Sequence, residues 1–465
     1  MRYFITLLAV FSLFITNPVH SQPDSLRANS PWNAQWIAIN NPLDKGTGYG
    51  VYYFRKSIDL AGKPSKFIIH VSADNQYKLY VNGKLMSIGP ARGNLYNWNY
   101  ETVDIAKYLT NGKNTVSALV WNEAQYRSEN QISLRTGFIV QGHSSAEEVL
   151  NTNNTWKCVE DKAYQPVWGY FVAINGQNMD MNKTVSNWNS PTLDDSKWPA
   201  AAGLFGGQPK GLSDGFGYIL QPSILPAREL VYQPITLVRN ATGIQLPATL
   251  KLPLTIPANK KVIILLDQTQ ETNAYPTINF SGGKGAALSL GYAEALYDRG
   301  SNFKIKSNRN DVEGKEFRGL TDSLTSNGGA GQTYTSFLFR TYRYMRVIVQ
   351  TADEPLVIDS LYGTFTAYPF KAEAKFNTDN KEIKQILDIG WHTARLNAFD
   401  FYFTGQYYER LQYIGDARIQ ALIAFYYSSD DRLTRNALNQ MDQSRLPEGV
   451  TLSRYPTQGT QIIPT

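Results

Sequence analysis

The sequence has one cysteine, Cys158, and four histidines among its 465 residues. A single cysteine excludes an intramolecular disulfide and a cysteine-based zinc site, and the histidines do not show the H-E-x-x-H spacing of zinc hydrolases. Charged residues make up 18% of the chain, no run of five like charges occurs, and the formal net charge is +6. We therefore expect neither nucleic acid as a partner nor a cofactor.

Long apolar runs are also missing, apart from one at the start of the chain. Residues 1–21 resemble a signal peptide, with Arg2 in a positive first region, an apolar stretch over residues 4–15, and a small-residue cleavage site ending at Ser21. That stretch is shorter than the roughly 20 residues of a membrane-spanning helix. No cysteine follows it to carry a lipid anchor. We expect an exported protein without a membrane span, located in the periplasm or outside the cell.

Aromatic residues are abundant, at 13% of the chain, which suits β-sandwich cores and stacking against sugars. Strand patterns run from residue 32 to about 221. Tyr77, Leu79 and Val81 alternate with polar residues, and Asn82-Gly83 then provides a tight hairpin turn. Residues 67–71 and 115–121 are further strand candidates. The pattern predicts an antiparallel β-sandwich over residues 31–222. Residues from about 194 to 226 are rich in glycine and proline and are expected to form a long connection.

A second β-sandwich is expected over residues 223–370, with strands at 262–266, 287–292, 342–349 and 357–365. The polar stretch 301–331 is expected to be a surface loop. From residue 371 the pattern becomes helical, with helices predicted at 381–397, 419–427 and 432–443 and Asp430 or Asp431 capping the last one. The fold class is therefore multidomain, with two β-sandwich domains followed by helices.

One catalytic motif occurs in a context that does not support it. Residues 211–215 match the G-x-S-x-G nucleophile elbow, which requires a sharp turn from a strand into a helix. Pro209 precedes the match and Gly217 follows it, so we interpret the segment as a loop.

Two carboxylates, Glu409 and Asp416, lie in a tyrosine-rich segment between predicted helices. Glycoside hydrolysis needs one carboxylic acid to protonate the leaving oxygen and a second carboxylate opposite it. Tyr407, Tyr408 and Tyr413 could wall a sugar pocket and, by excluding water, raise the pKa of Glu409. Alternatively, both acids are surface charges near helix ends and the tyrosines belong to the core.

The segment from Glu409 to Asp416 (ERLQYIGD) resembles the active-site signature of the inverting α-L-rhamnosidases of glycoside hydrolase family 78. The resemblance implies that Glu409 is the general acid and that Asp416 holds rhamnose hydroxyls. Tyr413 stands where that family usually has Trp. Further substrate-binding residues expected from the resemblance are Tyr408, Arg410 and Trp391.

That family places β-sandwich modules before an (α/α)6 barrel. Residues 371–465 have room for only the first helices of such a barrel, and the family's general base lies beyond them. We therefore expect a truncated catalytic domain and negligible turnover by this chain alone. Thr404-Gly405-Gln406 replaces the family's Asp-Cys-Pro, which removes one expected contact to the sugar. The expected substrate is a rhamnose-containing glycan or glycoside.

Two other functions are compatible with the sequence. In the first, the β-sandwich domains form a carbohydrate-binding protein, with Tyr96, Trp98 and Tyr100 as a stacking platform; core packing explains these rings equally well. In the second, the chain is a structural surface protein, which leaves the segment around Glu409 unexplained.

Overall fold

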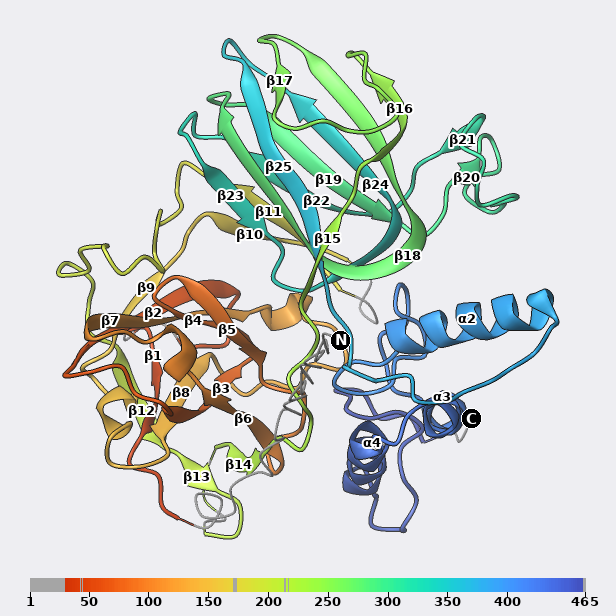
Figure 1. Cartoon of the computed structure of the whole chain (residues 1–465). Coiled ribbons are helices and arrows are strands. Elements are labelled where there is room, and N and C mark those ends of the chain that lie inside the picture. Colours follow the sequence, from red (N-terminus) through yellow and green to blue (C-terminus); the bar gives the residue numbers. More distant parts are fainter. Residues whose placement is uncertain are drawn as a thin grey trace, which may run out of the picture.

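The computed structural model describes residues 30–462, apart from positions 42, 44, 170–173, 213–214 and 216. The expected signal peptide and the serine of the G-x-S-x-G match lie outside the described residues. Two β-sheet units and a smaller helical unit make up the described molecule, with the helices beside both sheet units (Figure 1).

The first unit contains a seven-stranded and a five-stranded sheet. In spatial order the first consists of β12 (Ala202–Gly206), β1 (Gln35–Ala38), β8 (Gly137–Gly142), β3 (Ile68–Asp74), β6 (Trp98–Asp104), β14 (Ile219–Pro222) and β13 (Gln208–Pro209). The second consists of β5 (Lys84–Gly89), β4 (Gln76–Val81), β7 (Gly112–Asn122), β2 (Gly50–Leu60) and β9 (Lys157–Glu160). Three short 3-10 helices accompany them: η1 (Ala106–Tyr108), η2 (Ala124–Tyr126) and η3 (Glu148–Leu150).

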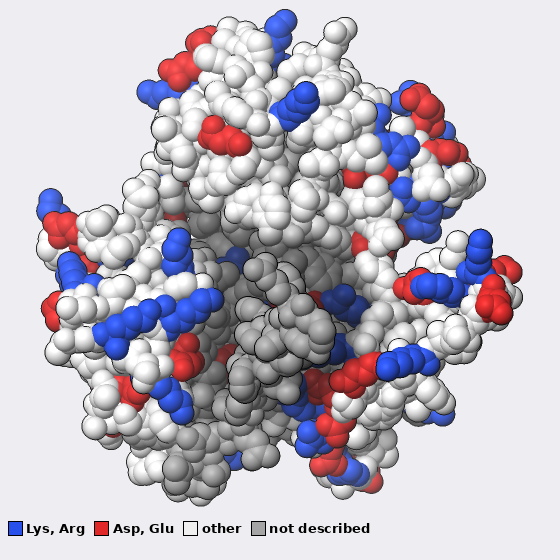
Figure 2. All heavy atoms as spheres, viewed as in Figure 1, with Lys and Arg blue, Asp and Glu red and all other residues white. Residues whose placement is uncertain are grey.

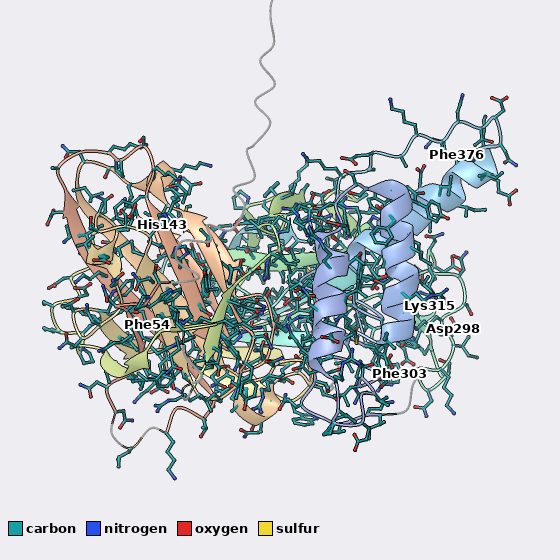
Figure 3. The ribbon with its side chains drawn as sticks, turned by 90° about the horizontal axis from the view of Figure 1, so that it is seen from below. Phe54, His143, Asp298, Phe303, Lys315 and Phe376 are labelled. Atoms are coloured by element: carbon teal, nitrogen blue, oxygen red, sulfur yellow. The ribbon has the colours of Figure 1, made fainter. Side chains whose placement is uncertain are left out.

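The two sheets share one hydrophobic core. Phe54 of β2 and Val71 of β3 belong to the same buried cluster although they come from different sheets; Phe54 is labelled in Figure 3. The predicted hairpin is confirmed: β4 pairs with β5 from Val81 to Lys84, and Asn82 and Gly83 both have positive φ angles, as a two-residue hairpin turn requires. The predicted strands at 67–71 and 115–121 are confirmed as β3 and β7.

The second unit is built on an eleven-stranded sheet. Its main path is β10 (Tyr164–Val167), β11 (Gly176–Asp180), β22 (Leu320–Thr325), β19 (Ala287–Ala293), β24 (Arg340–Gln350), β18 (Lys261–Gly282), β25 (Leu356–Phe365) and β15 (Val231–Pro234). Attached to this path are β16 (Leu237–Thr242), β17 (Leu254–Ile256) and β23 (Gln332–Thr335), and β20 (Tyr297–Asp298) pairs separately with β21 (Lys315–Glu316). All four strands expected in this region are present. Asp298 and Lys315 form an ion pair across the small hairpin (Figure 3).

Two expected connections contain strands. The surface loop predicted at 301–331 includes β22, in which Asp322 is fully buried. The charge of Asp322 is compensated by Arg340 on β24, at 2.9 and 2.7 Å, and this partner lies 18 residues further along the chain on a different strand. Likewise, residues 194–226 supply β12, β13 and β14 at the edges of the seven-stranded sheet.

The hairpin of β10 and β11 lies within residues 31–222 but pairs with β22 of the eleven-stranded sheet. This hairpin therefore continues the sheet of the second unit, whereas β9 before it and β12 after it belong to the first unit. The expected domain boundaries remain predictions.

The described residues contain three α-helices: α2 (Lys381–Leu396), α3 (Ile414–Tyr427) and α4 (Arg432–Gln443). The first and last match the prediction, whereas α3 begins five residues earlier than expected, because Asp416 in its first turn suits the positive end of the helix dipole. Asp430 accepts a hydrogen bond from the Arg432 amide at the start of α4. None of the helices in the described ranges has the length and apolar content needed to cross a bilayer.

Apolar side chains on α2 and α3 are open to solvent. Ile386 and Ile389 of α2 are 60% and 67% exposed, and Phe425 and Tyr426 of α3 are 52% and 80% exposed. The described residues therefore leave part of the apolar surface of both helices uncovered. Figure 2 shows charged side chains of both signs along α2 and on the β20–β21 hairpin, with few on the visible face of the large sheet unit.

Candidate active site

Glu409 lies in a closed loop that leads into α3. The Thr404 amide donates to the Leu411 carbonyl at 2.8 Å, and the Gly405 amide donates to the Glu409 carbonyl at 3.0 Å. These bonds turn the chain back on itself and leave the Glu409 side chain exposed. Among the described residues, no hydrogen bond or ion pair involves its carboxylate. An acid in this position is accessible to a ligand.

Arg410 anchors this loop to the second sheet unit. Its Nε donates to the Gln406 carbonyl at 2.7 Å, its Nη1 to the Phe339 carbonyl at 3.1 Å, and its Nη2 to Thr341 Oγ1 at 3.0 Å. The side chain is buried, and burial lowers the pKa of the guanidinium, with a further contribution from nearby Arg340. Because all three nitrogens bind protein atoms, the structure gives Arg410 a role in holding the loop; its expected contact with substrate remains a prediction.

Asp416 lies in the first turn of α3, where its carboxylate accepts a hydrogen bond from Thr404 Oγ1 at 3.1 Å. Thr404 is the position at which the resembled signature has an Asp. A carboxylate there would adjoin that of Asp416 and repel it, whereas the threonine hydroxyl donates to it. The departure from the signature is therefore matched by a local contact.

Tyr413 and Trp391 both contact protein groups. The Tyr413 hydroxyl accepts a hydrogen bond from Arg454 at 2.5 Å, and Arg454 also pairs with Glu129 of the first unit. Trp391 on α2 stacks on Tyr427 of α3, with ring centres 4.5 Å apart and an angle of 6°. These contacts fix both rings near the helices, and their expected role in sugar binding remains a prediction.

Tyr407 and Tyr408 line a cavity of about 190 Å³ between the loop and the second sheet unit. The Tyr407 hydroxyl donates to the Tyr292 carbonyl at 2.9 Å, and the Tyr408 hydroxyl lies 3.1 Å from that of Tyr297. Burial raises the pKa of Tyr407 above its ordinary value, so this phenol is neutral at physiological pH. Two of the expected pocket tyrosines therefore line one cavity next to Glu409 in the chain.

Glu271 on β18 is a residue that sequence reasoning missed. Its Oε2 accepts a hydrogen bond from Gln406 of the loop at 3.0 Å, and its Oε1 is buried without a hydrogen-bond partner among the described residues. Burial raises the pKa of Glu271 to about 7, with a further contribution from the negative charge of Glu294. Glu294 itself pairs with Lys306. Nothing in the local sequence of Glu271 marks it, since its partners are remote in the chain.

The expected stacking platform is not formed, because Trp98 and Tyr100 are buried, at 3% and 1% exposed, and only Tyr96 is open, at 77%. The single cysteine, Cys158, is buried in β9. The described part of the chain contains no group of three or more His, Cys, Asp or Glu side chains that could hold a metal ion.

Two models of known protein domains match this chain, one in the first sheet unit and one in the helical unit. A model of the α-L-rhamnosidase N-terminal domain matches residues 62–206, and a model of the bacterial α-L-rhamnosidase six-hairpin glycosidase domain matches residues 371–464. An α-L-rhamnosidase of Alteromonas sp. (strain LOR) is 20% identical over 445 residues, which cover 91% of this chain and 44% of the relative. One from Streptomyces avermitilis is 24% identical over 208 residues, 40% of this chain and 18% of the relative. The chain thus spans less than half the length of these curated relatives.

Solved structures share the fold. The family 78 rhamnosidase of Bacillus sp. GL1 superimposes with a TM-score of 0.76 at 15% identity, over 92% of this chain and 65% of that one. The α-L-rhamnosidase of Aspergillus terreus gives a TM-score of 0.67 at 17% identity, over 93% and 48% of the two chains. The segment that carries Glu409 and Asp416 lies within the matched six-hairpin region. The chain therefore belongs to the α-L-rhamnosidase family, glycoside hydrolase family 78.

Proposed function

We propose that this chain contains the general acid of an inverting α-L-rhamnosidase. In this proposal Glu409 protonates the leaving oxygen of a terminal α-L-rhamnoside. The observation that carries the proposal is the position of Glu409: it is exposed, its carboxylate makes no hydrogen bond or ion pair within the described residues, and it lies in the region that matches the six-hairpin glycosidase domain. General acid catalysis requires a carboxyl group that can reach the oxygen it protonates.

Asp416 is the proposed ligand of the rhamnose hydroxyls. Its carboxylate can accept several hydrogen bonds, and Thr404 occupies only one of these sites in the described structure. Tyr408, which is 46% exposed, is available to contact the sugar. The substrate class is a rhamnose-containing glycan or glycoside.

In this proposal the sheets form two β-sandwich domains, and α2, α3 and α4 are the first helices of an (α/α)6 barrel. The uncovered apolar side chains of α2 and α3 support this arrangement, because helices of a barrel bury such faces against neighbouring helices.

For the chain as it stands we propose negligible turnover. Inversion needs a second carboxylate, about 6.5–9.5 Å from the acid on the other face of the sugar, to activate water. A six-hairpin domain uses twelve helices, whereas the described residues contain three. The test is release of aryl alcohol from an aryl α-L-rhamnoside; turnover at ordinary glycosidase rates by this chain would refute the proposal.

The role of Glu409 is tested in a chimera in which residues 371–464 replace the matching segment of the Alteromonas enzyme. Glu409→Gln should lower kcat by about 10²–10⁴-fold for a substrate with a poor leaving group and by much less for an activated aryl leaving group, which needs no proton. Asp388→Asn, an exposed carboxylate on α2, is the matched control. Equal losses for both substrates would contradict the assignment of the acid. The anomeric form of the first product, observed by NMR, tests inversion.

We also propose that residues 1–21 are removed during export, which places the mature protein in the periplasm or outside the cell. The support is the sequence pattern alone. Sequencing the N-terminus of the exported protein should give Gln22 as the first residue, and full-length protein in the cytoplasm would contradict this proposal.

A further inference from the structure

The cavity beside Tyr408 adjoins the residue that carries the proposed acid. Its volume is about 190 Å³, smaller than the roughly 300–1,000 Å³ of typical small-molecule pockets, so it has room for one small unit of a larger ligand. Tyr408 and Arg410 both line it, and they are the immediate neighbours of Glu409 in the chain. Consecutive Cα atoms are about 3.8 Å apart. The cavity is therefore placed to receive a unit that is attached to the rhamnose.

One cation on the rim of the cavity has no acidic partner. Arg318, just before β22, lines the cavity and is exposed, and its side chain forms no hydrogen bond or ion pair with the described residues. Its guanidinium carbon lies 5.0 Å from the ring centre of Phe303, which is labelled in Figure 3. A ring face attracts a cation but does not neutralise its charge. The planar fork of an arginine matches a carboxylate, which it binds through two parallel hydrogen bonds.

A second cation in the lining is matched only by neutral groups. Arg410 is 3% exposed and donates to the carbonyls of Gln406 and Phe339 and to the hydroxyl of Thr341. None of these acceptors is charged, and no described carboxylate pairs with Arg410. A ligand does not have to touch this side chain to be affected by it, because a buried charge is screened less than an exposed one. Its field therefore adds to that of Arg318 and favours an anion in the cavity.

The acidic groups near the cavity do not offset these two charges. Asp322 is bound by Arg340, at 2.9 and 2.7 Å, and Glu294 pairs with Lys306. Burial raises the pKa of Glu271 to about 7, so this carboxyl is largely uncharged below that pH. The other charged residues of the β20–β21 hairpin carry both signs and are not among the described lining residues.

We propose that this cavity binds the carboxylate of a uronic acid unit, and that the rhamnose removed at Glu409 is attached to an acidic glycan. Arg318 binds the carboxylate, the charge of Arg410 supports it, and the ring of Tyr408, which is 46% exposed, offers an apolar face to the sugar. Glu409 is protonated when it acts as an acid, so it does not repel the carboxylate. This inference deepens the proposed hydrolysis and rests on it for the rhamnose, whereas the anion site itself does not require the chain to be catalytic.

The test is binding of galacturonic acid to the full chain at pH 6, measured by calorimetry and saturation-transfer NMR. The wild type should bind it at least about fivefold more tightly than galactose, which lacks the charge, and than acetate, which lacks the ring. Arg318→Gln should weaken binding of galacturonic acid about tenfold. Arg318→Lys, which keeps the charge but not the fork, should fall between the two. Arg299→Gln, at an exposed arginine of the same hairpin outside the lining, should bind like the wild type.

Four results would each overturn the proposal: no binding of galacturonic acid, equal binding of galactose, equal binding of acetate, or equal losses in Arg318→Gln and Arg299→Gln. Thermal melting of the two variants identifies any loss of folding. Should Arg318→Gln melt lower than Arg299→Gln, the preference of the wild type for galacturonic acid over galactose decides. None of these measurements involves turnover, so a negative result here is distinct from a failure of Glu409 in the chimera.

Discussion

Glu271 offers a sharp test of how the second sheet unit and the Glu409 loop are joined. Its carboxyl is mostly buried, accepts a hydrogen bond from Gln406, and has a pKa raised from the ordinary 4.5 to about 7. The perturbation is Glu271→Gln, which keeps the shape and the acceptor oxygen of the side chain but removes its ability to ionise.

The magnitude follows from the shift in pKa. An acid whose pKa is raised on folding favours the folded state when protonated, so its stabilising contribution is complete below about pH 4.5 and is lost as the pH rises through about 7. At about 1.36 kcal/mol per pKa unit, full ionisation lowers the free energy of unfolding by up to about 3 kcal/mol. The variant should therefore match the wild type near pH 4.5 and exceed its stability by up to about 3 kcal/mol at pH 8.5.

The assay is urea unfolding of both proteins across this pH range, following the transition of the eleven-stranded sheet unit, because a multidomain chain has no single unfolding free energy. Asp388→Asn, which removes an exposed carboxylate on α2, should change stability by less than about 1 kcal/mol at every pH. A stability difference between Glu271→Gln and wild type that does not vary with pH would refute the reasoning.

Three further predictions concern other parts of the structure. Arg340→Leu should lower the free energy of unfolding by about 3–5 kcal/mol, because Asp322 is then buried without its ion-pair partner. In urea titrations the double variant Arg340→Leu with Asp322→Leu should recover much of this loss. A double variant as unstable as the single one would contradict the pairing. Thr404→Asp should place a second carboxylate beside Asp416 and lower the melting temperature at pH 7 more than Thr404→Asn, which adds no charge; an equal change for the two variants would exclude repulsion. Cys158, whose thiol pKa is raised by burial, should react with a thiol reagent only in the unfolded chain, so rapid labelling of the native protein would argue against its burial.

Much of the architecture could be predicted because it depends on local periodicity. The alternation of Tyr77, Leu79 and Val81 and the turn at Asn82 are properties of neighbouring residues, and they predicted β4 and its hairpin correctly. The spacing of apolar residues did the same for α2 and α4. The prediction failed where a partner on another strand decides: β22 was interpreted as a loop because its residues are polar, and the burial of Asp322 depends on Arg340, 18 residues further along the chain.

The features of the candidate site also fall into those that neighbouring residues determine and those that tertiary contacts determine. Glu409 and Asp416 could be identified together because they are seven residues apart in one segment, and the sequence by itself determined their identity and their family. Only the tertiary structure decided that Glu409 is exposed, that Arg410 holds its loop, and that Glu271 contacts it from β18. The physical reason is that exposure and side-chain partnership depend on contacts between segments that are 69 to 135 residues apart in the sequence, and these contacts leave no periodic mark on either segment.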